Sequence, residues 1–150
     1  MDPIESKLSK IKWSYAEGDP DALATLVARV EDAARREDLI NYSNLVRGVW
    51  FHLPNVNKSQ PFQIDVHDWR DLDRAILGEF LGYISTLSYR KGKFMASALV
   101  INKTEFRPSH HFFNWMRDLE VLSARDVDDF WQEEVKKAFE WFKTNSLKDS

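Results

Sequence analysis

The sequence predicts a mainly helical α+β fold that contains a small β-sheet. Apolar residues recur every three or four positions over most of the chain, which is the spacing of amphipathic helices. Residues 95–102 are instead apolar on both faces, as an internal β-strand would be. Ten Phe, six Trp and four Tyr accompany only five Gly and five Pro, a composition that argues against disorder. At 150 residues the chain has the size of one domain, which we expect to span residues 1–150.

Two helices are predicted before residue 40. Asp2-Pro3-Ile4-Glu5 places an N-cap acid, a first-turn proline and an N3 glutamate ahead of an amphipathic pattern, so we expect a helix over residues 3–16. Gly18 ends this helix, and Asp19-Pro20-Asp21 repeats the start signal for a second helix that reaches about Arg36. The pair should form an N-terminal helical hairpin.

Helices and strands alternate between residues 41 and 107. Asn41 is placed to cap a helix whose apolar side, including Trp50, faces inward, and Pro54 stops it. We expect a helix over residues 41–51, a half-exposed strand over 62–66, a long helix over 68–89 and the internal strand over 95–102.

The end of the chain is again helical in the prediction. Arg107-Pro108-Ser109 starts a helix that carries Phe112 and Met116 on its apolar side. Ser123-Ala-Arg-Asp126 resembles a capping box for the last helix.

The order helix, strand, helix, strand, turn in the middle of the chain has the outline of a winged-helix unit. Four segments carry a resemblance to uncharacterised bacterial and phage proteins, and they are also similar to the winged-helix half of alkyltransferase-like proteins: Tyr42–Val46, Phe80–Ser85, Ser97–Lys103 and Pro108–Phe113. The resemblance covers residues 41–115. It implies a winged-helix-like core (41–107), which the predicted helical hairpin (1–40) and C-terminal helices (108–150) would flank.

The absence of cysteine excludes several chemistries. Disulfides, thiolate nucleophiles and sulfur-ligated metals all need this residue, and so does the reaction of true alkyltransferases. A cysteine-free chain fits a reducing cytoplasm, where we expect the protein to act without a cofactor or metal.

The charge balance excludes a global attraction to polyanions. The net charge is −3 and the pI is about 5.8, so any binding to nucleic acid needs a local cationic surface. No apolar run approaches the roughly 20 residues that cross a bilayer, and Met1–Glu5 is unlike the start of a signal peptide. We expect no membrane partner.

A local cationic surface is present between Ser88 and Arg107. It contains a single acid, Glu105, and five cations: Arg90, Lys91, Lys93, Lys103 and Arg107. As a basic hairpin, this strip would contact phosphates, which predicts a non-enzymatic module that binds DNA or a protein. The alternative is a charged loop that keeps a buried strand soluble.

An acidic surface lies near the start of the last predicted helix, at Asp126, Asp128, Asp129 and Glu133. It favours a second hypothesis, an immunity or inhibitor protein that binds a basic toxin or nuclease. The alternative is a solvated helix start, where acids are favoured in any case.

A third hypothesis, a small hydrolase, depends on Asp65 and His67. Residues two apart on a strand share a face, so they would form an acid–imidazole pair. His110 and His111 are adjacent and should point about 100° apart on a helix, which does not suit joint metal binding. No phosphate-loop, dinucleotide or nucleophile-elbow motif is present.

Small residues form a stripe along the predicted long helix, at Ala75, Gly78, Gly82 and Ser85. Glycine inside a helix costs up to about 1 kcal/mol relative to alanine. We therefore expect another group to pack closely against the helix backbone at these positions. Either a neighbouring element packs there, or the stripe forms a groove for a partner.

Overall fold

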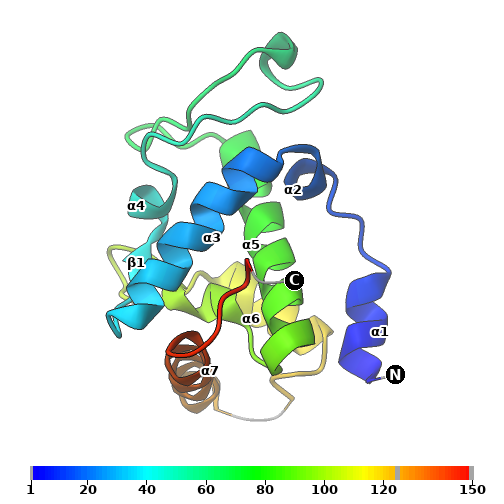
Figure 1. The fold of residues 1–150 in the computed structure, drawn as a ribbon, viewed down its shortest axis with the longest axis vertical. Coiled ribbons are helices and arrows are strands. Elements are labelled where there is room, and N and C mark those ends of the chain that lie inside the picture. Colours follow the sequence, from blue (N-terminus) through cyan, green and yellow to red (C-terminus); the bar gives the residue numbers. More distant parts are fainter. Residues whose placement is uncertain (1, 124–125, 149–150) are drawn as a thin grey trace.

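The computed structural model describes residues 2–123 and 126–148. Helix α5 (Asp71–Gly92) runs through the middle of the molecule, and the other helices pack around it (Figure 1). Most of the described chain is helical, and its named strands form one small two-stranded sheet. The predicted α+β class with mainly helical content is confirmed.

The N-terminal segment contains helices α1 (Pro3–Ser9), α2 (Ser14–Gly18) and α3 (Pro20–Arg35). The predicted continuous helix over 3–16 is therefore wrong. The Glu79 side chain of α5 accepts hydrogen bonds from the backbone N–H groups of two residues at the start of α2, which fixes a new helix start there. α1 packs against α5, whereas α2 packs against both α5 and α3.

The sheet joins residues far apart in the sequence. Strand β1 (Ile40–Asn41) pairs in parallel with strand β2 (Val100–Ile101). The predicted strand over 95–102 is correct only at β2, because Ala96–Leu99 forms the 3-10 helix η2. Its predicted burial is confirmed, since Met95–Val100 is buried throughout.

Side chains explain why the segment before β2 does not extend as a strand. The buried Ser88 Oγ contacts both the carbonyl of Phe94 and the N–H of Ala96, at 2.7 and 2.9 Å. Ser97 N–H donates to Ser85 Oγ at 2.9 Å, and Met95 N–H donates to the Glu134 carboxylate at 2.9 Å. Side chains thus satisfy backbone groups that a neighbouring strand would otherwise satisfy.

The helix predicted over 41–51 ends early, as α4 (Tyr42–Val46). The guanidinium of Arg29 donates to the backbone carbonyls of Asn44, Leu45 and Arg47, and so caps the carboxyl end of α4. Trp50 is 60% exposed, so its predicted inward orientation is wrong.

A long loop, residues 47–70, follows α4 and extends away from the helices before α5 begins (Figure 1). It contains the short 3-10 helix η1 (Asn57–Ser59), and an antiparallel bridge between Phe51 and Phe62 closes it. Of the strand predicted over 62–66, only this bridge at Phe62 forms. α5 then starts after Arg70 rather than at Asp68, because Arg70 N–H donates to the Asp73 carboxylate at 3.0 Å.

Helices α6 (His110–Asp118) and α7 (Val127–Phe142) complete the fold. The cap of α7 is Asp126, whose carboxylate accepts from the N–H groups of Asp128 and Asp129, and not Ser123 as predicted. The middle of the predicted capping box, residues 124–125, lies outside the described residues.

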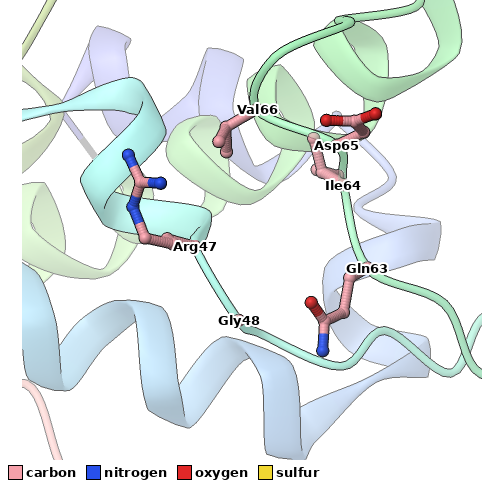
Figure 2. Close-up of a pocket in the computed structure, with 6 residues that line it drawn as sticks. All are labelled: Arg47, Gly48, Gln63, Ile64, Asp65 and Val66. Atoms are coloured by element: carbon pink, nitrogen blue, oxygen red, sulfur yellow. The ribbon is translucent and has the colours of Figure 1, made fainter.

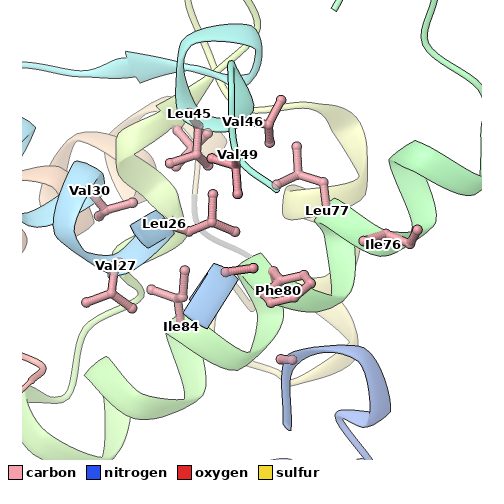
Figure 3. Close-up of a cluster of buried hydrophobic side chains, with 14 of the residues drawn as sticks. Leu26, Val27, Val30, Leu45, Val46, Val49, Ile76, Leu77, Phe80 and Ile84 are labelled. Carbon is pink, nitrogen blue, oxygen red and sulfur yellow. The ribbon is translucent and has the colours of Figure 1, made fainter. Parts of the chain in front are cut away.

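The core gathers where three helices meet. Leu26 and Val30 of α3, Leu45 of α4, and Phe80 and Ile84 of α5 are all fully buried and face one another (Figure 3). A second buried cluster joins α1, η2, α6 and α7. Within residues 2–123 and 126–148, no helix has the length and apolarity needed to cross a membrane.

Candidate functional site

A large cavity opens along one side of α5. Its volume is about 980 Å³. The floor comes from α5 and the walls come from α4, the start of α6 and the segment that precedes α2. Leu77, Leu81, Trp69, Phe112 and Trp115 contribute apolar or aromatic surface to it.

The small-residue stripe forms part of the cavity floor. A methyl group added at Gly82 would lie 2.6 Å from two atoms of the Trp13 indole ring, so close packing of Trp13 requires glycine there. A methyl group at Gly78 would meet nothing within 4 Å. Both residues line the cavity, as does Ala75. Packing therefore explains Gly82, whereas Gly78 faces open space.

Trp13 forms one wall of this cavity. Its ring meets Trp115 of α6 edge-on at a centroid distance of 6.1 Å and lies 6.2 Å from the ring of Tyr83. Only 8% of Trp13 is exposed, and its indole N–H has no hydrogen-bond partner among the described residues. A buried donor without an acceptor is costly.

The start of α6 supplies polar groups to the same cavity. Ser109, the N-cap residue, does not cap the helix with its side chain, and its backbone N–H donates to Tyr42 Oη at 2.9 Å. The rings of His110 and His111 lie 4.2 Å apart, so they do not diverge as predicted. All four residues line the cavity.

The charged residues of the cavity lining are Asp71, Arg74 and Lys103. Arg74 and Asp71 form an exposed ion pair at 3.3 Å. Lys103 is exposed in the turn after β2 and forms no ion pair with the described residues. One unneutralised cation therefore stands at the cavity.

The five cations of the predicted strip are distributed over several elements. Arg90 and Lys91 lie in the last turn of α5, and Lys93 caps that helix, so the hairpin predicted to carry them is wrong. Lys91 Nζ donates to the carbonyl of Leu147 at 3.2 Å. Arg90 is exposed, like Lys103.

Lys93 belongs to a cluster with acids of α1 and its cap. It pairs with Glu5 at 3.0 Å and with Asp2 at 3.6 Å, and the hydrogen bond that it donates to Glu5 raises the pKa of Lys93. Tyr89 Oη donates to Asp2 at 2.6 Å, which lowers the pKa of Asp2. Burial, followed by this hydrogen bond, raises the pKa of Tyr89. These contacts hold α1 to the end of α5.

The predicted basic and acidic surfaces touch each other. Arg107 pairs with Asp128 at 2.9 Å, and its guanidinium lies 5.0 Å from the centre of the Phe113 ring. Asp126 caps α7, and Glu133 lies 4.0 Å from Lys137. Asp129 is exposed on the same helix.

Asp65 and His67 lie in the long loop between α4 and α5. The carboxylate of Asp65 accepts a hydrogen bond from the backbone N–H of His67 at 2.9 Å, and both residues are exposed. Asp65 lines a small pocket of about 320 Å³, across which Arg47 lies (Figure 2). Asp65 thus stabilises a turn, and no described hydrogen bond joins it to the imidazole.

No known protein family matches the chain, and neither do any curated proteins or solved structures.

Most of the cavity lining was not predicted from the sequence. Trp13, Tyr42 and Trp115 are far apart in the sequence and resemble ordinary core aromatics. The one signal that pointed to the cavity was the pair of glycines inside the long helix.

Proposed function

We propose that the protein is a non-enzymatic binding module that holds a small, largely apolar ligand in the cavity beside α5. The observation that carries this proposal is the cavity itself. Its volume of about 980 Å³ lies at the upper end of the range of about 300–1,000 Å³ that is typical of small-molecule sites. Apolar and aromatic side chains form much of its lining, and its polar residues come from α4, α5, η2, the turn after β2 and the start of α6.

Gly78 supports the same proposal. Its φ angle is not in the left-handed region, and no neighbour would meet a Cβ atom there. Neither backbone conformation nor packing inside the protein therefore explains a glycine at this position. A bound ligand that approaches the α5 backbone would explain it.

The experiment uses 2-naphthol, a neutral planar probe, titrated into the full chain with tryptophan fluorescence as the readout. Saturable binding is expected, because Trp13, Trp69 and Trp115 all line the cavity. Gly78→Phe should abolish binding by filling the cavity, and Gly78→Ala should weaken it because the ligand approaches the α5 backbone there. Arg90→Gln, which changes an exposed residue outside the cavity lining, serves as the control. Absence of saturable binding, or binding unchanged by Gly78→Phe in a folded variant, would contradict the proposal.

Nucleic-acid binding is a second proposal, which follows the resemblance to winged-helix proteins expected from the sequence. The exposed side chains of Arg90 and Lys103 favour it, because neither forms an ion pair with the described residues. The pairing of Lys93 and Arg107 with acids leaves fewer cations for phosphates than the sequence indicated. The salt dependence of DNA binding tests this proposal.

The immunity hypothesis and the hydrolase hypothesis have less support. Asp128 is already paired with Arg107, and Asp126 is used as a helix cap. A basic partner would have to compete with those contacts. For hydrolysis, Asp65 and His67 form a turn contact through the backbone, which leaves an acid–imidazole pair without a described hydrogen bond.

A further inference from the structure

We infer that the ligand of this cavity carries an anionic group, such as a carboxylate, held by Lys103 beside the start of α6. This inference rests on the proposed function, because it assigns the chemistry of the ligand that the cavity would hold. The expected occupant is a small apolar acid.

The charges of the lining favour an anion. Arg74 and Asp71 neutralise each other as an ion pair at 3.3 Å. Lys103 is the remaining charged residue among the described lining residues, and no carboxylate pairs with it. An apolar cation would meet repulsion from Lys103 without a free acid to bind it, whereas an apolar anion would find a partner.

The hydrogen-bonding groups favour an acceptor. Tyr42 Oη already accepts a hydrogen bond from Ser109 N–H, so its own proton is free to be donated to a ligand. The imidazoles of His110 and His111, which line the same cavity, each offer at least one N–H donor. A carboxylate accepts hydrogen bonds and donates none, so it would accept the free proton of Tyr42.

The N-terminus of α6 lies at the cavity and also favours an anionic ligand. This N-terminus, which has no side-chain cap, contributes Ser109, His110 and His111 to the cavity. Unpaired N–H groups give a helix start a partial positive charge that stabilises anions. The helix start alone would not identify a ligand, but here it adjoins the unpaired Lys103 and the free hydroxyl proton of Tyr42.

The experiment compares two probes of the same shape, 2-naphthoate and 2-naphthamide, by calorimetric titration of the full chain. The naphthoate should bind about tenfold more tightly, which corresponds to about 1.4 kcal/mol for one charge-assisted contact. Lys103→Gln should remove most of that ratio. Arg90→Gln is the matched control, because it removes an exposed cation that does not line the cavity, and it should preserve the ratio.

The outcomes separate this inference from the proposed function. Equal binding of both probes, or a ratio that survives Lys103→Gln, would overturn the anionic ligand while the cavity still binds. A ratio lowered equally by Arg90→Gln would show a general charge effect and would also overturn the inference. If neither probe binds, the proposed function itself fails. Thermal unfolding of each variant confirms that the fold is retained.

Discussion

Trp13 packs so closely against Gly82 that the two residues fix each other. A Cβ atom at position 82 would lie 2.6 Å from both Cη2 and Cζ3 of the indole. The same ring meets Trp115 at 6.1 Å. This contact therefore joins the segment before α2 to both α5 and α6, and it builds one wall of the cavity.

Gly82→Ala should destabilise the protein, although alanine is the better helix former. Its methyl group has to displace a rigid buried ring, and overpacking of this kind typically costs about 1–3 kcal/mol. Urea unfolding measures the change. A variant as stable as the parent would show that Trp13 moves aside without cost.

Gly78→Ala is the opposite case in the same helix. The added methyl group meets nothing within 4 Å, so the gain in helix propensity is not offset. We expect stabilisation of about 0.5–1 kcal/mol in the same urea experiment. A decrease in stability would mean that position 78 is more crowded than described.

Asp73 should make stability depend on pH. Its side chain is 1% exposed, and burial raises its pKa, but hydrogen bonds from Arg70 at 2.8 and 3.1 Å outweigh burial and hold the pKa below its ordinary value. The stabilisation is then present above the unfolded pKa of about 3.9 and disappears as pH falls through the folded pKa.

Asp73→Asn tests this directly. Near neutral pH the variant should be about 1–3 kcal/mol less stable than the parent, because hydrogen bonds to a charged group are removed. The difference from the parent should shrink as the pH falls below the unfolded pKa of about 3.9 and towards the lower folded pKa of the carboxyl group. Urea curves at several pH values measure it, and a constant difference would contradict the role of ionised Asp73.

Ser88→Ala tests why the segment before β2 is not a strand. The variant leaves the Phe94 carbonyl and the Ala96 N–H without their side-chain partner. A buried group left unsatisfied costs about 1–3 kcal/mol. Ser9→Ala, which removes an exposed hydroxyl, should stay within about 0.5 kcal/mol. Equal effects of the two changes in urea unfolding would refute this explanation.

The nucleic-acid proposal makes its own prediction for Arg90 and Lys103. Replacing both by Gln should weaken DNA binding and make the plot of log affinity against log salt shallower, by about one unit for each phosphate that the protein no longer binds. Filter binding at several salt concentrations measures the slope. An unchanged slope in the folded variant would show that these two side chains do not bind phosphates.

Local signals in the sequence predicted the starts of α1 and α3 correctly. Asp2 and Asp19 cap α1 and α3 as expected, because capping needs only neighbouring residues. The break at residues 10–13 and the early end of α4 depend on Glu79 and Arg29, which act from distant positions in the sequence. Contacts of that kind leave no periodic signal.

The candidate site, too, was predictable only where a local signal exists. Gly78 and Gly82 indicated a special surface on α5, because glycine is unfavourable inside a helix wherever it lies. Nothing local indicated that Trp13, Tyr42 and Lys103 line the same cavity. The hairpin predicted to carry Arg90 and Lys91 does not form because α5 extends through both residues to Gly92.

The most direct measurement of the central claim is the set of intermolecular nuclear Overhauser effects between 2-naphthoate and the labelled full chain. Binding in the cavity predicts effects to the methyl groups of Leu77 and Leu81 and to the rings of Trp13 and Trp115. Trp50 and Phe106, 60% and 72% exposed, offer the probe alternative apolar surface outside the cavity. Effects confined to those two residues would contradict the claim that the cavity is the binding site.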